Sequence, residues 1–287
     1  MRAEHRGILP DAQARFFPHT GGVDAGPFEL TEPITGETPV VVEVPHASVR
    51  LDPASMALCL APVREVAADA DLYVDELMAD APLEGASLIV SRWSRYVVDL
   101  NRDEDDVDDR AVEGGTSKTR PWGLLWCETT SGVEALRGPV SRDELTRRLD
   151  WLYRPYHAAL DALVKRKKQR FGRVVVLSAH SMPSFGVSAD VVMGTLRGTT
   201  AAWGVVDLVE QEARSFGWCV AHDEPYAGGA TTRRHGNPQG ATHAIQIELA
   251  RRLYMDEETL GKRADGFSLA RSFCRRLVAK VGAAALG

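Results

Sequence analysis

Apolar residues form two kinds of run along this chain. Short segments rich in Val and Ile are typical of β-strands, and they lie at residues 39–45, 86–93, 96–100, 173–180, 190–195 and 243–249. Longer segments carry apolar residues at helical spacing, and they lie at residues 63–81, 141–170, 199–216 and 256–280. Two of these open on SRDE and DEET, which are typical helix starts. We therefore expect strands that alternate with helices.

This order of elements predicts an α/β fold, with a mixed β-sheet flanked by helices on both faces. The continuous apolar runs VVVEV and VVVL fit central strands, which are buried on both sides. The chain has 287 residues, of which 44% are hydrophobic, and this is enough for a sizeable core. We expect one α/β domain over residues 1–287, with residues 1–34 as an N-terminal extension.

Charge and cysteine content narrow the class of protein. The formal net charge is -6 and the arginines are scattered among acids, so no basic surface for nucleic acid is expected. The first residues, MRAEHRGILPDAQARF, lack the apolar core of a signal peptide, and no segment is apolar for long enough to span a membrane. The four cysteines stand far apart in the sequence, as reduced thiols do. We expect a cytoplasmic protein with neither a nucleic-acid nor a membrane partner.

Two histidines share one sequence context. His46 and His180 each follow a Val-rich strand and precede a serine closely, in VVVEVPHAS and RVVVLSAHSMPS. Because ligands of open α/β sheets bind outside the carboxyl ends of the strands, the two imidazoles can converge on one point. Imidazole nitrogens are natural zinc ligands, and a carboxylate would complete a catalytic set. The alternative for either histidine alone is a structural or surface role.

An ordered set of segments connects the chain with a known family. The set is PHAS, DADLYVDEL, SRYVVDLNR, SAHSMPS, ADVVMGT, PYAGGATTRRHGNP and HAIQIELARRLYMDE. From about residue 35 to residue 260 it resembles the N-formylglutamate amidohydrolase family. The resemblance implies a phosphorylase/hydrolase-like α/β sandwich related to the zinc carboxypeptidases. It also implies zinc-dependent cleavage of N-formyl-L-glutamate to formate and L-glutamate, a step of histidine degradation.

The resemblance implies one zinc ion per chain, held by His46, Asp71 and His180. Asp71 is chosen because the family pattern has an acid at the start of the helix that contains DADLYVDEL. Asp69 and Asp75 compete with it, and Asp75 would share a helix face with Asp71. One of these neighbours could instead orient the ligand through a hydrogen bond. An acidic first turn favoured by the helix dipole is the alternative for each aspartate taken singly.

Glu248 interrupts a run that otherwise reads as a buried strand, where an unpaired carboxylate is costly. By resemblance it matches the family's catalytic glutamate, which acts as general base toward water and then as proton donor to the leaving amine. The alternative is an ion pair with Arg251 or Arg252.

Three arginines and an asparagine are the remaining candidates. Asn101 and Arg102 directly follow a predicted strand, where a guanidinium and an amide can hold a substrate carboxylate, as the similar DLNR element of zinc carboxypeptidase relatives suggests. Arg95 is expected to hold a second carboxylate or to polarise the scissile carbonyl. Arg233, in a Gly-rich segment, corresponds to a family arginine and is expected to bind a glutamyl carboxylate.

Two departures from the family pattern leave the substrate open. Ala230 stands where the family often has an aromatic residue, and residues 107–130 are individual to this chain. Another N-acyl amino acid or a γ-glutamyl peptide is therefore the alternative substrate, because the same attack on a carbonyl cleaves each of them. A metal-free ligand-binding protein is the alternative class. A serine hydrolase has less support, since neither SAHS nor PHAS is a G-x-S-x-G elbow.

Overall fold

The computed structural model describes residues 26–116 and 121–286, and their central element is a seven-stranded sheet. Its strands are β1 (Phe28–Thr31), β2 (Val40–Val44), β3 (Ser87–Ser91), β4 (Val174–Met182), β5 (Val191–Gly194), β6 (Val220–His222) and β7 (Thr242–Ala250). Their order is β1-β3-β2-β4-β7-β5-β6. The strands β3, β2, β4 and β7 are parallel, whereas β1 and β5 run antiparallel to β3 and β7. The mixed sheet predicted from the sequence is thus confirmed.

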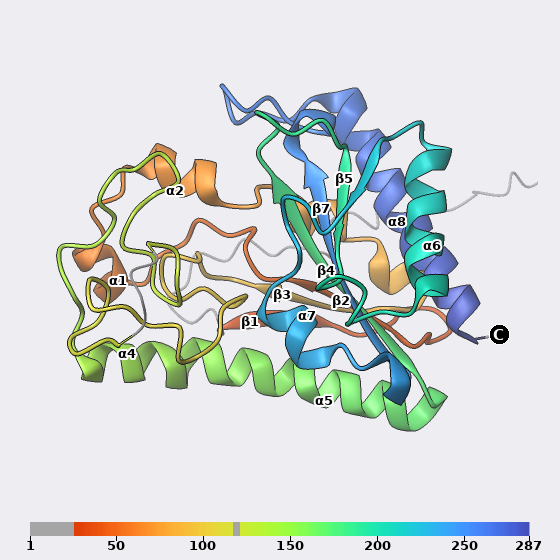
Figure 1. Cartoon of the computed structure of the whole chain (residues 1–287), viewed down its shortest axis with the longest axis horizontal. Coiled ribbons are helices and arrows are strands. Elements are labelled where there is room, and N and C mark those ends of the chain that lie inside the picture. The colour runs from red at the N-terminus through yellow and green to blue at the C-terminus, as the bar shows by residue number, and fades with distance from the viewer. Residues whose placement is uncertain (1–25, 117–120, 287) are drawn as a thin grey trace, which may run out of the picture.

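Helices cover both faces of this sheet, as expected. They are α1 (Pro53–Leu58), α2 (Val63–Asp69), α3 (Val74–Leu77), α4 (Arg142–Arg148), α5 (Arg154–Phe171), α6 (Trp203–Ser215), α7 (Ala230–His235) and α8 (Ala264–Leu286). A π-helical turn, Leu149–Tyr153, joins α4 to α5, and 3-10 turns lie at Ala81–Glu84, Pro238–Gly240 and Arg251–Leu253. Figure 1 shows α5 along one face and α6 and α8 on the other. None of the described helices is both long and apolar enough to cross a membrane.

Strand alternation sorts the side chains of the sheet between its two faces. Val42, Leu177 and Ile247 pack with α6 and α8, whereas Val41 and Val176 pack with α5. The α5 face also carries a group of buried polar residues that we call the polar row: Glu43, Ser178, His180, Gln246 and Glu248. Glu43 pairs in register with Ser178, Ser178 with Gln246, and His180 with Glu248. The register therefore gathers polar side chains toward the carboxyl ends of three neighbouring strands.

Two sequence predictions of secondary structure are wrong. Residues 96–100 form turns, and their apolar side chains are buried against α4 and α5 instead of lying in a strand. The helix expected at 63–81 is broken between α2 and α3, where Ala70 is extended and Tyr73 has a φ of 70°. The break lies where the Asp71 N–H donates to the carbonyl of His46 at 3.0 Å, which replaces a helical hydrogen bond.

Several element boundaries also differ from the prediction. The last helix begins at Ala264 instead of residue 256. The short strands β1 and β6 and the helix α7 have no counterpart in the sequence prediction. β1 lies within the segment that the sequence assigns to an N-terminal extension, and it pairs with β3.

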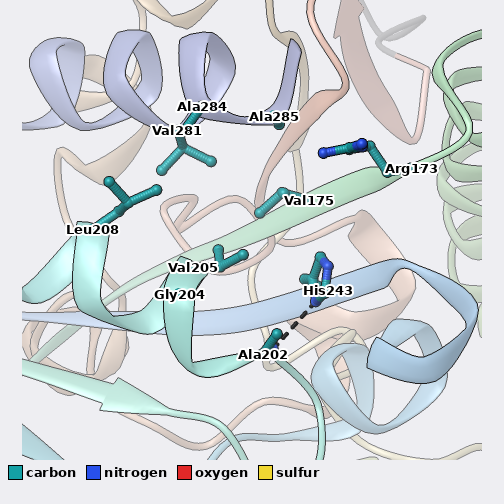
Figure 2. A pocket seen from close by; sticks show the side chains of 10 residues that line it. All are labelled: Arg173, Val175, Ala202, Gly204, Val205, Leu208, His243, Val281, Ala284 and Ala285. Atoms are coloured by element: carbon teal, nitrogen blue, oxygen red, sulfur yellow. Dashed lines mark hydrogen bonds between the residues drawn. The ribbon is translucent and has the colours of Figure 1, made fainter. Parts of the chain in front are cut away.

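A cavity of about 210 Å³ lies on the face of the sheet opposite the polar row. Figure 2 shows its walls, formed by β4, β7, α6 and α8, with Val175 and His243 side by side. These two residues are register partners whose side chains share the α6 and α8 face. The cavity is mostly apolar and is separated by the sheet from the residues predicted to carry chemistry.

Arg148 stabilises the turn segment that contains residues 96–101 by hydrogen bonds to its backbone. Its side chain is fully buried, and its guanidinium donates to the carbonyls of Val97 at 2.8 Å and Tyr96 at 3.4 Å and to Glu144 at 2.8 Å. Replacing Arg148 by Met should lower the free energy of unfolding by about 3–5 kcal/mol, because these acceptors lose their buried donor. Urea unfolding measures this change.

The matched control is Arg147→Met in the same helix turn. The Arg147 side chain is 36% exposed and pairs with Glu144 and Asp52, so its loss should cost less than about 1 kcal/mol. Equal effects of the two substitutions would contradict the role given to Arg148.

Candidate metal centre

His46, Asp71 and His180 meet at one buried point near the carboxyl ends of β2 and β4. Their possible ligand atoms all lie within 4.8 Å of one another. The Nδ1 atom of His180 lies 3.0 Å from Oδ2 of Asp71, and the Nδ1 atom of His46 lies 3.6 Å from the same oxygen. Both imidazoles therefore present Nδ1 to a single carboxylate oxygen.

Each of the three residues is positioned by a different element. His46 follows β2 by two residues, as predicted, and Asp71 lies in the break between α2 and α3. His180 lies inside β4, which continues to Met182, so the prediction that it follows the strand is wrong. Arg251 holds the break by donating to the carbonyls of Ala68 and Ala70.

A buried carboxylate fixes the tautomer of His46. Its Nε2 lies 2.8 Å from Oδ1 of Asp99, whose other oxygen accepts hydrogen bonds from Arg95 and Trp126. Burial opposes ionisation of Asp99, but the positive charges near it, among them the guanidinium groups of Arg95 and Arg102, hold its pKa well below the ordinary value. The ionised Asp99 thus accepts the Nε2 proton, which leaves the Nδ1 of His46 with its lone pair.

A second buried carboxylate acts on His180 through a hydroxyl. The Nε2 of His180 lies 3.0 Å from the Ser178 hydroxyl, which donates to Glu43 at 2.7 Å. Glu43 also accepts a hydrogen bond from Tyr156 at 3.0 Å. Because the single hydroxyl proton of Ser178 is committed to Glu43, Nε2 of His180 is the donor and Nδ1 carries the lone pair.

These tautomers make the site suited to a cation. Two nitrogen lone pairs and a carboxylate oxygen repel one another unless a positive charge lies among them. Nδ1 of His46 is buried and has no hydrogen-bond partner among the described residues. In the metal-free chain, protonation of His180 supplies part of this positive charge. Burial opposes the protonation, but the hydrogen bond to Asp71 and the charge of Glu248 raise the pKa of His180. Two imidazole nitrogens and one carboxylate are a donor set that suits zinc.

The two competing aspartates lie outside this cluster. The carboxylate of Asp69 accepts hydrogen bonds from Tyr96 and Thr130. Asp75 belongs to α3, and burial raises the pKa of its carboxyl. Asp71 does not start a helix and shares no helix face with Asp75, so that part of the prediction is wrong.

Glu248 is the register partner of His180 on the neighbouring strand β7. Its Oε1 accepts a hydrogen bond from Gln246 at 2.7 Å, and burial raises the pKa of its carboxyl. The alternative ion pairs with the two following arginines are not formed. Arg251 binds carbonyls of the α2–α3 break, and Arg252 binds Asp190 and three carbonyls of residues 187–189.

Of the predicted substrate groups, Asn101 and Arg95 lie nearest to the cluster. The amide of Asn101 lies 3.4 Å from Nε2 of His180 and donates to Gln246 at 3.0 Å. Arg95 donates to Asp99 and stacks over Trp126 at 4.1 Å. Its partner Asp99 was missed by the sequence analysis, as were Glu43, Ser178 and Gln246.

The other two arginines lie farther out. Arg102 donates to the carbonyls of Trp122 and Asn101, and its charge helps to lower the pKa of Asp99. Arg233 is 53% exposed and forms an ion pair with Asp103. The structure therefore places Arg102 in the turn after Asn101, and Arg233 in α7, which begins beside Asn101.

The fold is a mixed α/β sheet, and it holds the His46–Asp71–His180 cluster beside the buried Glu248. This combination of fold and site defines the class of protein as a hydrolase of amide bonds with a candidate metal centre. The model of the N-formylglutamate amidohydrolase family matches residues 38–255, and the chain belongs to that family. An N-formylglutamate deformylase of Pseudomonas putida is 31% identical over 229 residues, which are 77% of this chain and 84% of that protein. One of Pseudomonas aeruginosa is 31% identical over 253 residues, which are 85% of this chain and 92% of that protein.

Solved structures agree with this assignment. The crystal structure of an N-formylglutamate amidohydrolase from Ralstonia eutropha JMP134 is similar with a TM-score of 0.83 and 30% identity, over 91% of this chain and 98% of that one. A gene product of Agrobacterium tumefaciens shares the fold, with a TM-score of 0.67 and 20% identity over 94% of this chain and 99% of that one.

The tautomer of His46 gives a test of the site. Replacing Asp99 by Asn should lower zinc affinity about 10–100-fold, because the imidazole loses the carboxylate that orients it. Competition with a chelator of known affinity measures the change. Asp150→Asn, which alters a 58% exposed carboxylate, is the control. Unchanged zinc affinity in the Asp99 variant would contradict the tautomer assignment.

Proposed function

We propose that this chain is a zinc-dependent amidohydrolase that cleaves N-formyl-L-glutamate to formate and L-glutamate. The observation that carries the proposal is the pair of Nδ1 atoms directed at one oxygen of Asp71, with Glu248 beside them in register. The substrate is suggested by the names of the Pseudomonas and Ralstonia relatives. We further infer a cytoplasmic enzyme of histidine degradation that binds one zinc ion per chain.

His46, Asp71 and His180 are the proposed zinc ligands. When bound, zinc supplies a Lewis acid for the amide carbonyl and lowers the pKa of a water molecule. A preformed ligand set needs little rearrangement, because Asp99 and the Ser178–Glu43 pair already fix both imidazole rings.

Glu248 is the proposed general base and acid. It accepts a proton from the attacking water and returns it to the nitrogen of the leaving amine, so that formate and the free amine are released. Burial raises the pKa of its carboxyl, which makes it a stronger base than an exposed glutamate. Gln246 orients the carboxylate by donating to Oε1.

Arginines on a turn and on α7 are the proposed anchors for the substrate carboxylates. Arg102 follows Asn101 directly, and Arg233 lies in α7 two residues after Thr231, whose N–H donates to the Asn101 amide oxygen at 3.1 Å. Asn101 thus joins the two segments that carry these guanidinium groups. Arg95 is proposed to act from within the site, because Asp99, which also binds His46, holds its guanidinium in place.

The first prediction from this proposal concerns the metal. The purified wild type should contain about one zinc per chain and release formate from N-formyl-L-glutamate, whereas His46→Ala and His180→Ala should lose both properties. Mass spectrometry gives the metal content, and a formate assay gives the activity. His222→Ala is the control, because His222 lies outside the cluster and pairs with Glu210.

Each outcome separates the alternatives. Zinc without formate release would reject this substrate and favour another N-acyl amino acid, tested with N-acetyl-L-glutamate. Formate release that persists without metal would reject the metal site.

The second prediction concerns the base. Glu248→Gln should lower kcat about 10³-fold while zinc content stays the same, because the amide cannot accept the proton. Steady-state formate release and metal analysis on one preparation measure both quantities. Glu113→Gln, on the exposed surface, is the control. A Glu248 variant with full kcat would remove this residue from the reaction.

A further inference from the structure

Tyr226 lies in the segment between β6 and α7, close to the end of the polar row. It packs against a small cluster that contains Met182, Val192 and Ala250. Met182 and Ala250 are register partners, and each lies two residues after His180 or Glu248 on the same face of the sheet. Val192 is the register partner of Glu248 on β5. The ring of Tyr226 is therefore adjacent to the proposed base and metal ligands.

The hydroxyl of Tyr226 has no hydrogen-bond partner among the described residues, although the residue is only partly exposed. Four other tyrosines use their hydroxyls within the protein: those of Tyr73 and Tyr153 donate to carbonyls, and those of Tyr96 and Tyr156 donate to Asp69 and Glu43. The hydroxyl of Tyr254 also lacks a partner among the described residues, but it is fully buried, whereas Tyr226 is partly exposed and open to a ligand. Burial and the nearby charge of Glu248 raise the pKa of Tyr226. Its hydroxyl is thus a neutral donor that the fold leaves free.

Close backbone contacts fix the segment that carries this residue. The carbonyl of Ala227 accepts a hydrogen bond from Leu196 at 2.7 Å. A Cβ added to Gly229 would lie 2.3 Å from the amide of Asn101, and one added to Gly194 would lie 2.6 Å from the nitrogen of Gly228. Only glycines allow this approach, so the segment rests directly on Asn101 and β5. Tyr226 is held in place before any substrate binds.

The other strong donors near Glu248 are already engaged. Arg95 binds Asp99, Arg251 binds the carbonyls of the α2–α3 break, and the Asn101 amide binds Gln246. Glu248 and Asp71 also contribute to the electrostatic environment of Tyr226. They would repel a substrate carboxylate at that point, so the acceptor there must be a different oxygen.

We propose that the Tyr226 hydroxyl donates a hydrogen bond to the carbonyl oxygen of the scissile amide as that oxygen gains negative charge. This inference rests on the proposed amide hydrolysis and adds a catalytic residue to it. Water adds to the carbonyl carbon, the carbonyl oxygen takes up the electron pair, and the C–N bond breaks as Glu248 protonates the amine. The donor stabilises the charge during the step and keeps its own proton.

The test is Tyr226→Phe, which keeps the ring and its packing. We expect kcat to fall about 10²-fold with KM changed less than about twofold, because the hydrogen bond forms only as charge develops. Tyr73→Phe, which removes a half-buried hydroxyl bound to the Leu260 carbonyl, should leave kcat unchanged. An unchanged kcat in the Tyr226 variant, or a raised KM with full kcat, would overturn the proposal.

A binding measurement separates this inference from the choice of substrate. Acetohydroxamate presents a negative oxygen to a metal site, and calorimetry on the zinc-loaded protein should show about tenfold weaker binding by Tyr226→Phe than by the wild type. If the wild type releases no formate from N-formyl-L-glutamate, the proposed substrate is wrong, yet this comparison still decides on Tyr226. Equal acetohydroxamate affinities would overturn its role as a donor.

Discussion

The buried negative charge at the carboxyl ends of the central strands is the constraint on which the rest of the site depends. Four carboxylates carry this charge, and each is at most 4% exposed: Glu43, Asp71, Asp99 and Glu248. Hydrogen bonds connect them to His46, His180, Ser178 and the Gln246–Asn101 pair. Among the described residues, the guanidinium groups that form ion pairs with these carboxylates are those of Arg95 and Arg251. The four carboxylates thus outnumber the two guanidinium groups by two. Because uncompensated charge is costly in the interior, this excess negative charge requires protons or a cation. A divalent ion would satisfy that requirement where the two Nδ1 atoms already converge.

The same constraint explains the irregular backbone around the site. A regular helix through residues 63–81 would occupy the backbone N–H of Asp71, which instead donates to the carbonyl of His46. The carbonyls left free by the break are bound by Arg251, and those of the turn at residues 96–97 are bound by Arg148. Buried arginines thus satisfy the backbone where helix and strand are interrupted, and the interruptions bring Asp71 and Asp99 to the histidines.

Sequence reasoning found the parts of the site that interrupt an apolar pattern. His46 was located from its position after a Val-rich run, and Glu248 from a charge inside a buried strand. The same rule applied to VVVEV would have found Glu43. It could not find Asp99, because the hydrogen bond to His46 joins residues that are 53 positions apart in the sequence. Ser178 lies two residues before His180 on the same face of β4, and its role depends on the strand register that brings Glu43 to its hydroxyl. Residues 96–100 were mistaken for a strand because apolar residues buried under a helix produce the same short run.

The division of the site between sheet and loops also bears on what can change in evolution. His180, Gln246 and Glu248 lie on adjacent parallel strands whose register sets their spacing, so a shift of one residue would move them to the other face. The groups that would meet the substrate lie on loops: Arg102 in the turns after residue 100, and Tyr226 in the segment between β6 and α7. Loops accept substitutions that a sheet does not. The proposed proton transfer is therefore tied to the fold, whereas acyl-group selectivity would depend on residues that can vary without disturbing the proposed metal ligands.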